Sequence, residues 1–413
     1  MAKKEKIENK PIFDIKEFIK RFNDEVLKTK YKGWDKTYIP SKILENVVEY
    51  LMWISERSDG KSYIAMEMIL YLKKWYNYSG AMIRRYDEDL VYSNGVEIVS
   101  NLIGFNELVY TRTKGKCDNA VIEIFEGQYN TIDYESRKYY LAFDGKDDQG
   151  KDIHIRDKKP FMYAFAISKE ERKKGTAYPD IKITIFDEFI SRGAYLPEEF
   201  ISYQNLLSTI IRRRDDVINI LCANAINRYC IYFQEMGLKH VKEQKQGTID
   251  YYEFGEPVVM RVAVEMIAPI DNKYKKSNKY FAFDNPKLKM ITEGKFELAL
   301  YPHLPVRYKP KDIKFIYYII FDGECFQCNI IKVDNNMFTF IHPKTTEINM
   351  NRNTLIFTPE INVSPHYRRK ITFTQDDIGN MIASFYKKDK VFYSDNSTGD
   401  TIHNYLLWCG SMR

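Results

Sequence analysis

A short loop joins the apolar run YLMWIS to a segment with helical spacing of apolar residues, and it carries glycine, lysine and serine in succession. A glycine at such a turn lets backbone N–H groups point inward, and the N-terminus of the following helix adds partial positive charge where phosphates would lie. Lys61 would then reach the β- and γ-phosphates of a nucleotide, and the Ser62 hydroxyl would bind Mg²⁺. The residues predicted to bind the nucleotide are Ser55, Arg57, Ser58, Asp59, Gly60, Lys61, Ser62 and Tyr63.

This loop departs from the Walker A pattern G-x-x-x-x-G-K-[ST] at its first position, where Ser55 replaces glycine. The tripeptide GKS by itself is also typical of an exposed turn that precedes a helix. The flanking strand and helix favour the phosphate-binding interpretation, because a phosphate loop requires that context.

Two adjacent carboxylates, Asp187 and Glu188, end the strongest predicted strand of the chain, IKITIFDE. A buried parallel strand delivers its last residues to the edge of the sheet where ligands bind. In a Walker B strand of this kind, Asp187 would hold the Mg²⁺ shell and Glu188 would orient and polarise the attacking water. An acidic pair that merely caps the next helix is the alternative, and the GKS loop upstream favours an ATPase.

A polar residue and three arginines flank the next predicted strand, residues 217–223. Asn224, at its end, can sense the γ-phosphate or the nucleophilic water, or it can cap the following helix. Arg212, Arg213 and Arg214 precede the strand. They either complement the helix dipole and pair with the neighbouring aspartates, or one of them acts as an arginine finger on the nucleotide of a neighbouring subunit. The second interpretation makes the protein a ring.

Three other arginines are weaker candidates for contact with phosphate. Arg57 lies inside the loop and could act within its own subunit. Arg84 and Arg85 follow the second predicted strand, GAMIR, and could sense phosphate from there.

Strands that alternate with helices predict an α/β fold with a mostly parallel central sheet covered by helices. The expected type is the P-loop NTPase of the ASCE class, which has an additional strand between Walker A and Walker B. We divide the chain into an ATPase domain at 1–250, a linker region at 251–310 and a small C-terminal α/β domain at 311–413. The sequence also predicts a helix at 41–49 and strands at 107–113 and 120–127.

Composition narrows the class of protein. The chain has 413 residues, a net charge of +6 and a charged N-terminus without the apolar core of a signal peptide. Its longest apolar run is too short to span a bilayer, so we expect an intracellular soluble protein without a membrane partner. The only C-x-x-C, Cys325 and Cys328, falls in a predicted strand that sends the two thiols to opposite faces, which favours two half-buried cysteines over a zinc site.

Together these segments resemble the DNA-packaging (encapsidation) ATPases of small short-tailed bacteriophages, relatives of the terminase large subunits. The resemblance covers roughly residues 36–255 and lies in SERSDGKSY, GAMIRRYDED, IKITIFDEF, LLSTIIRRRDDVINILCANAINRY and KQGTIDYYEF. It implies ATP and Mg²⁺ as cofactors. It also implies nucleotide and metal contacts from Lys61, Ser62 and Asp187, catalysis by Glu188, a sensor or coupling role for Asn224, and a trans-acting finger among Arg212, Arg213 and Arg214.

The family further implies an ATP-driven double-stranded DNA translocase. It would form a homo-oligomeric ring, expected to be a pentamer, which acts in the host cytoplasm and docks transiently on the portal vertex of a procapsid. An adaptor RNA or protein is a further candidate partner. In such proteins the C-terminal domain resembles a terminase nuclease of RNase H type that has lost cutting.

The C-terminal carboxylates agree with a vestigial nuclease. A two-metal nuclease needs three or more converging carboxylates. Asp322 lies where the family has its first catalytic aspartate, Asp395 and Asp400 are later candidates, and Asp376 and Asp377 do not form a convincing middle member. Two alternatives stay open: a complete terminase with an active endonuclease, and a nucleotide switch or scaffold protein that moves nothing.

Overall fold

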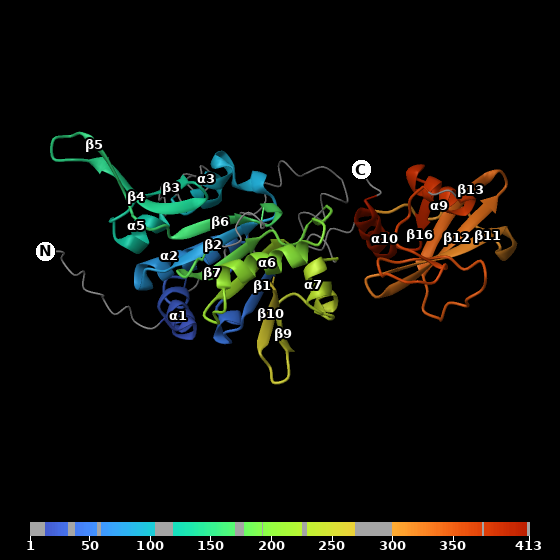
Figure 1. The fold of residues 1–413 in the computed structure, drawn as a ribbon, viewed down its shortest axis with the longest axis horizontal. Coiled ribbons are helices and arrows are strands. Elements are labelled where there is room, and N and C mark those ends of the chain that lie inside the picture. Colours follow the sequence, from blue (N-terminus) through green and yellow to red (C-terminus); the bar gives the residue numbers. More distant parts are fainter. Residues whose placement is uncertain are drawn as a thin grey trace. The chain divides into compact units, whose positions relative to one another are not determined.

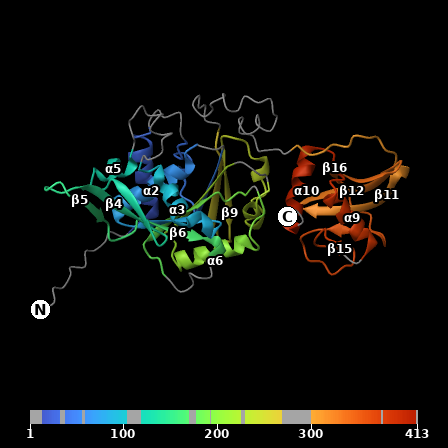
Figure 2. The same ribbon diagram turned by 90° about the horizontal axis from the view of Figure 1, so that it is seen from above.

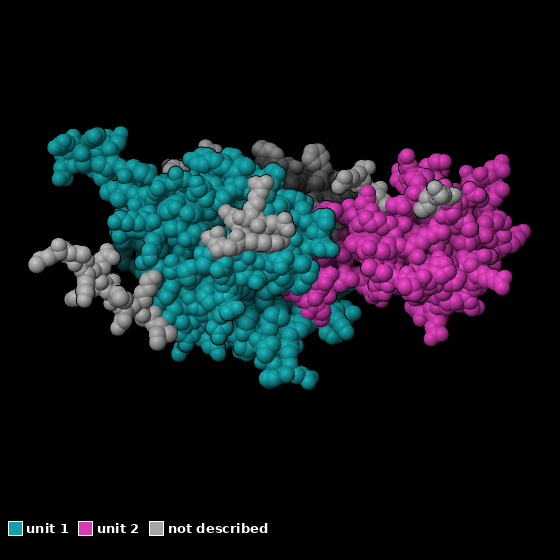
Figure 3. Space-filling view, in the orientation of Figure 1, with its two compact units in different colours: residues 1–190, 196–225, 238–276 teal, residues 191–195, 226–237, 277–413 magenta. Residues whose placement is uncertain are grey.

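The computed structural model of the chain contains two compact units, which are coloured separately in Figure 3. Unit 1 comprises residues 1–190, 196–225 and 238–276, and unit 2 comprises residues 191–195, 226–237 and 277–413. The structure describes residues 13–31, 38–55, 59–103, 119–169, 177–191, 193–224, 229–268, 300–373 and 376–410.

A ten-stranded sheet organises unit 1, in the order β3-β4-β6-β2-β7-β8-β1-β10-β9 with β5 paired to β4 (Figure 1). Neighbouring strands from β6 to β10 in this order are parallel, and the antiparallel pairs of the described strands lie toward the two edges. The strands are β1 (Tyr50–Ser55), β2 (Ser79–Arg84), β3 (Thr131–Glu135), β4 (Lys138–Lys146), β5 (Asp152–Arg156), β6 (Met162–Ala166), β7 (Ile181–Asp187), β8 (Ile218–Asn224), β9 (Thr248–Phe254) and β10 (Met260–Met266). The predicted α/β fold with a mostly parallel sheet is confirmed.

The helices of unit 1 cover both faces of this sheet (Figure 2). Ile183 and Ile185 of β7 pack into the cluster that contains the apolar residues of α2, whereas Phe186 points the other way and stacks on Tyr203 of α6 at 5.2 Å. Burial on both faces explains why the central strands read as continuous apolar runs. The helices are α1 (Ile15–Arg21), which continues as a π-helix (Phe22–Leu27), α2 (Lys61–Tyr76), α3 (Tyr92–Ser100), α5 (Ala120–Phe125) and α6 (Glu199–Ile211), with short 3-10 turns at Ile43–Glu45, Asp87–Leu90 and Val241–Glu243.

Unit 2 contains a second sheet, in the order β15-β14-β11-β12-β13-β16. The long strands β11, β12 and β13 form an antiparallel meander, while β14 and β15 run parallel to β11 on its other side. Its elements are α7 (Ile231–Glu235), a 3-10 turn (Pro310–Asp312), β11 (Ile313–Phe321), β12 (Glu324–Val333), β13 (Asn336–Pro343), β14 (Ile356–Phe357), β15 (Tyr367–Arg368), α9 (Asp377–Lys387), β16 (Val391–Tyr393) and α10 (Asn396–Cys409).

Two local predictions are wrong. The strand predicted at 120–127 is instead helix α5 over Ala120–Phe125 and a turn, because Val121, Ile124 and Phe125 bury together at helical spacing. The side chain of Asn119 caps this helix by accepting from the Ile122 N–H at 3.0 Å. In the predicted helix at 41–49, only a 3-10 turn forms. The predicted strand at 107–113 lies outside the described residues.

The expected linker begins too early. β9 and β10 fall within residues 251–310 for most of their length, yet β10 pairs with β1 in parallel, Tyr50 opposite Val262. The aromatic and β-branched residues of β9 and β10 predict strands but do not indicate which sheet the strands join. Only the pairing of β10 with β1 shows that they extend the main sheet. Residues up to Met266 therefore belong to the fold of unit 1.

The two cysteines of the C-x-x-C differ in burial, and the prediction that both are half-buried holds for Cys325 alone. Cys328 is buried in the hydrophobic cluster of unit 2, whereas Cys325 is only half-buried. Burial raises the pKa of both thiols, which disfavours the thiolate form that zinc requires. Within the described ranges, no helix combines the length and the apolar character needed to cross a membrane.

A histidine with two carboxylate partners lies on the hairpin of β4 and β5, which extends away from the rest of unit 1 (Figure 1). The His154 ring lies 2.7 Å from Asp144 and 2.8 Å from Asp133, and these hydrogen bonds raise its pKa above the usual value of 6.5. Because the pKa of His154 is higher in the folded than in the unfolded chain, protonation of His154 stabilises the fold. This contribution to stability is complete below pH 6.5, and it is lost as the pH rises through the pKa of the folded state.

We therefore predict that His154→Gln lowers the thermal midpoint more at about pH 5.5 than at about pH 8.5. The measurement is the difference in midpoint between wild type and variant across that range. A difference that grows with pH would contradict the predicted sign.

Candidate nucleotide-binding and catalytic site

Four neighbouring parallel strands end at one edge of the main sheet and carry the predicted site residues. In spatial order β2, β7, β8 and β1, they end in Arg84, Asp187, Asn224 and Ser55. The pairing register keeps these ends level, with Ser55 opposite Asn224 and Asp187 opposite Cys222. β8 thus lies between the Walker A and Walker B strands, which confirms the expected additional strand.

The phosphate loop ends at a helix N-terminus, as predicted. Gly60 has a φ of 85°, in the left-handed region that favours glycine, and it precedes the first residue of α2. Because α2 is sixteen residues long, its first N–H groups and dipole favour an anion at this point. Asp59 is buried, Tyr63 packs against the core of unit 1, and Arg57 and Ser58 lie outside the described residues.

The serine that departs from the Walker A pattern contacts the Walker A lysine. Ser55 is buried, and its hydroxyl oxygen lies 2.6 Å from Nζ of Lys61. The same ammonium group lies 3.4 Å from Oδ1 of Asn224. These contacts hold the Lys61 ammonium at the edge of the sheet, next to the N-terminus of α2. The predicted phosphate contact of Lys61 agrees with this position and stays a prediction.

Asn224 lies beside the lysine of the GKS turn. It is the last residue of β8, and its Oδ1 lies 3.4 Å from Nζ of Lys61. Residues 225–228, where the predicted helix after Asn224 would begin, lie outside the described residues. Both the sensor role and the capping role of Asn224 therefore stay predictions.

The Walker A and Walker B segments meet through a hydrogen bond. The Ser62 hydroxyl donates to Oδ1 of Asp187 at 2.7 Å. A hydroxyl beside a carboxylate is the oxygen-rich pair that Mg²⁺ prefers, and phosphate oxygens and water supply its remaining ligands in sites of this kind. No group of three histidine, cysteine or acidic side chains forms a metal site in the described residues. The residues present therefore fit Mg²⁺.

Arg84 is more closely involved in the site than its sequence position suggested. One guanidinium nitrogen lies 2.8 Å from Oδ2 of Asp187, and another lies 3.4 Å from Oε2 of Glu188. The arginine thus neutralises both carboxylates at once. Glu188 has a φ of 62°, and its side chain is 64% exposed, so that its carboxylate is open to the space above the sheet edge.

The three arginines of the predicted finger differ in their contacts. Arg214 donates to the carbonyls of Ile210 and Ile211, which complete the end of α6, and to the carbonyl of Ile181 at the start of β7. The side chains of Arg212 and Arg213 are exposed, and neither has a hydrogen bond or ion pair within the described residues.

The contact with Ile181 also fixes where these arginines lie. β7 runs from Ile181 to Asp187, a span of about 20 Å, so the arginines occupy the opposite edge of the sheet from Asp187. They cannot reach the nucleotide site of their own subunit. A finger role would therefore require a second subunit, and the structural interpretation stays open for Arg212 and Arg213, whereas Arg214 has the contacts that it predicts.

Among the described residues of unit 2, no three acidic side chains lie together as a metal site. Asp322 lies in the tight turn between β11 and β12, with φ of 57° followed by 77° at Gly323. Asp376 and Asp395 cap α9 and α10 respectively, and Asp376 also pairs with Arg368 at 2.8 Å. These structural roles account for acidic residues that the sequence offered as metal ligands.

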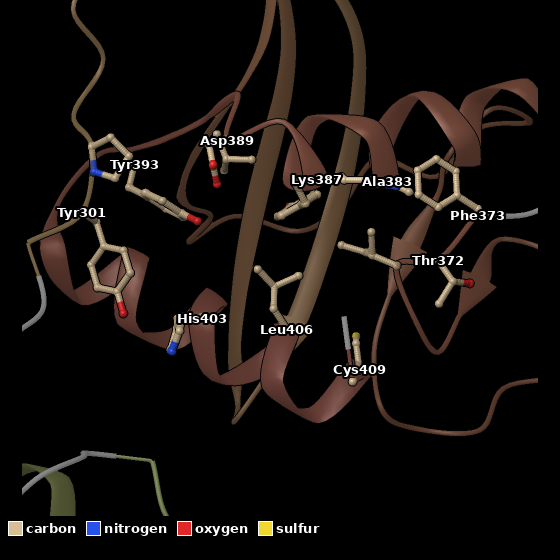
Figure 4. Close-up of a pocket in the computed structure, with 15 residues that line it drawn as sticks. Tyr301, Thr372, Phe373, Ala383, Lys387, Asp389, Tyr393, His403, Leu406 and Cys409 are labelled. Carbon is tan, nitrogen blue, oxygen red and sulfur yellow. The ribbon is translucent and has the colours of Figure 1, made fainter. Parts of the chain in front are cut away.

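A cavity of about 480 Å³ lies beside α9, β16 and α10 (Figure 4). Tyr301, Tyr393, His403 and Leu406 point into it, and Asp389 is the only acidic residue among the described residues that line it. A two-metal centre needs three or more carboxylates, and the described lining of this cavity supplies one.

We predict that Arg214→Ala lowers the free energy of unfolding by about 1–3 kcal/mol, because it leaves several carbonyl groups without their donor. The matched control, Arg212→Ala, should stay within about 0.5 kcal/mol of wild type because its side chain is exposed. Urea denaturation measures both. Equal losses in the two variants would contradict the structural role of Arg214.

Comparison with known proteins finds similarity to phage packaging proteins. Residues 107–243 match the model of the family described as Podovirus DNA encapsidation protein (Gp16). A segment of 91 residues is 33% identical to the DNA packaging proteins of Bacillus phages PZA and phi29, and it covers 21% of this chain and 27% of each relative. The alignments thus span about a quarter of the length of those relatives.

A solved structure with a similar fold is the bacteriophage phi29 viral genome packaging motor assembly, with a TM-score of 0.52 and 19% identity over 92% of this chain and 100% of that chain. The large terminase of a thermophilic bacteriophage has a TM-score of 0.31 and 11% identity over 93% of this chain and 90% of its own. The matched family region contains Glu188, Arg212–Arg214 and Asn224, and it begins after the phosphate loop. The resemblance to the DNA-packaging proteins of small phages is confirmed in that region.

Proposed function

We propose that this chain is the ATPase of a viral DNA-packaging motor, which hydrolyses ATP and moves double-stranded DNA into a procapsid. The observation that carries this proposal is the meeting of Lys61, Ser62, Asp187, Glu188 and Asn224 at one edge of a parallel sheet. The matching region of the packaging family, which contains the last three of these residues, supports DNA as the substrate that is moved.

The site residues divide the work of ATP hydrolysis between them. The phosphates would bind at the N-terminus of α2, where Lys61 exchanges its contact with Ser55 for phosphate oxygens. Ser62 and Asp187 would hold Mg²⁺, which neutralises charge on the phosphates when it is bound. Glu188 would orient the attacking water and accept its proton.

Arg84 has to move for this reaction to proceed. Its guanidinium lies 2.8 Å from the carboxylate of Asp187, which is needed for Mg²⁺. A bound triphosphate offers the arginine a stronger set of anionic oxygens than the two carboxylates do. Arg84 would therefore exchange its contacts with Asp187 and Glu188 for the γ-phosphate, and this exchange would release Glu188 for catalysis.

The arginines beyond α6 support a ring. Arg212 and Arg213 are exposed and distant from their own nucleotide site, so either can act only on the nucleotide of a second subunit. Such a finger contributes about a thousandfold or more to the rate in related nucleotidases.

In rings that mix wild type with Arg213→Ala or Arg212→Ala, we predict that ATPase activity falls more steeply than the fraction of wild-type subunits. Full activity in both variants rejects the role.

Unit 2 supports a vestigial nuclease of RNase H type. Its strand order, β13-β12-β11-β14-β15, with an antiparallel meander followed by two parallel strands, agrees with that fold. Its aspartates serve turns and helix caps instead of converging on metals. Nicking of plasmid DNA by the full chain with Mn²⁺, lost in Asp322→Ala, would favour a complete terminase instead.

The expected partners follow from this proposal. The motor would be a homo-oligomeric ring, expected to be a pentamer, bound to double-stranded DNA and to the portal vertex of a procapsid in the host cytoplasm. An adaptor RNA or protein remains a candidate bridge between the ring and the portal.

We predict that double-stranded DNA stimulates ATP turnover of the wild-type chain and that Glu188→Gln lowers turnover by at least about a hundredfold, because the attacking water loses its base. The variant should bind MgATP with unchanged affinity, since Glu188 is not among the phosphate ligands. Steady-state turnover with and without DNA measures the first effect, and equilibrium binding measures the second. ATP turnover that ignores DNA would support the nucleotide switch or scaffold instead.

A further inference from the structure

A buried ion pair lies directly behind the catalytic glutamate. The guanidinium of Arg85 makes two contacts with the carboxylate of Glu199, at 3.0 Å and 2.9 Å. The side chain of Arg85 is 8% exposed, and that of Glu199 is fully buried. Glu199 is the first residue of α6, and Arg85 follows the last residue of β2, so the pair joins segments 114 residues apart in the chain.

The remaining nitrogens of Arg85 hold the backbone at the catalytic residue. Nη1 donates to the carbonyl of Glu188 at 3.1 Å, and Nη2 donates to the carbonyl of Phe189 at 2.8 Å. From the other side, the N–H groups of Glu188 and Phe189 both donate to the carbonyl of Cys222, at 2.8 Å and 3.3 Å. The peptide groups around Glu188 are therefore held on both sides.

This anchoring matters because Glu188 adopts a left-handed backbone conformation, with a φ of 62°. A residue other than glycine rarely adopts this backbone conformation, and it keeps the conformation only when contacts with its surroundings impose it. The exposed carboxylate has a side-chain contact with Arg84 at 3.4 Å, and that contact must break during the reaction proposed above. The backbone then has to define where the carboxylate points.

Glu199 also closes the far end of the same loop. Its carboxylate accepts from the N–H of Leu196 at 2.8 Å. Residues 191–195, between the two anchored ends, are part of unit 2. One ion pair thus fixes both ends of the segment that leaves the catalytic edge and returns to it.

We propose that Arg85 and Glu199 are a positioning pair that holds the backbone of Glu188 in the conformation needed to aim its carboxylate at the attacking water. This inference rests on the ATPase function proposed above. The pair does not touch the nucleotide; it acts through the carbonyl groups of Glu188 and Phe189 and through the start of α6. A buried ion pair can also serve stability alone, and the two roles differ in what they do to the chemical step.

The test is Arg85→Lys in the full chain. Lysine keeps the charge but lacks the planar fork, so it cannot pair with both oxygens of Glu199 and also reach both carbonyls. We expect kcat to fall about a hundredfold, as for a misplacement of about 1 Å. The KM for MgATP should change less than about threefold, because Lys61, Ser62 and Asp187 keep their places. Amide hydrogen exchange in residues 186–196 should rise.

The chain provides a matched control on β7, at the opposite end of that strand from Glu188. Lys182 of β7 is also buried, and it pairs with Asp216. Lys182→Met breaks that ion pair without touching the catalytic edge. It should lower the thermal midpoint and leave kcat within about twofold of wild type.

The outcomes separate the possibilities. Wild-type kcat in Arg85→Lys, or a raised KM with unchanged kcat, overturns the positioning role. If Arg85→Lys does not fold, Arg85→Gln combined with Glu199→Gln keeps the site neutral, and a hundredfold lower kcat in that folded variant supports the proposal while wild-type kcat overturns it. A wild-type chain without ATP turnover overturns the proposed function and the catalytic role of the pair together. In that case unchanged hydrogen exchange in the variants would also exclude the anchoring of residues 186–196.

Discussion

The hydrogen bond from Ser62 to Asp187 joins two segments that are 125 residues apart, and the rest of the site depends on this meeting. It forms because β1, β8 and β7 are parallel neighbours with level ends, so the start of α2 and the end of β7 face each other. A sheet with another strand order would separate the lysine from the carboxylates. The long apolar strands, buried under helices on both faces, fix the relative positions of the residues at this edge.

The charges at this edge balance in a way that suits exchange with a ligand. Lys61 rests on neutral oxygens of Ser55 and Asn224, and Arg84 rests on the two carboxylates. A magnesium-bound triphosphate brings both negative oxygens for the cations and a cation for Asp187, so each group gains a partner when the nucleotide arrives. Behind these charges, Arg85 and Glu199 are buried, contact each other and, through Arg85, contact the carbonyl groups of Glu188 and Phe189. The site therefore has charges that a nucleotide can contact in front and a buried ion pair behind.

Much of this site could be predicted from the sequence because its signals are local. The GKS turn before α2 and the acidic pair at the end of β7 each occupy a few consecutive residues, and Asn224 ends β8. The sequence offered Arg85 only as a phosphate contact. Its pairing with Glu199 was out of reach, since nothing in the chain indicates that residues so far apart meet. Two fold errors have related causes. The β-branched residues of α5 resemble a strand until their burial at helical spacing is seen, and β9 and β10 resemble any aromatic strand pair until β10 is found beside β1.

The central claim is that Lys61 and Asp187 serve one magnesium-bound triphosphate. The most direct measurement is equilibrium binding of an ATP analogue with and without Mg²⁺, in wild type, Asp187→Asn and Lys61→Ala. The account predicts that Mg²⁺ strengthens binding at least about tenfold in wild type, that Asp187→Asn loses this gain while its Mg²⁺-free binding persists, and that Lys61→Ala binds weakly under both conditions. An Asp187→Asn variant that keeps the full gain from Mg²⁺, or a Lys61→Ala variant with wild-type affinity, would contradict it.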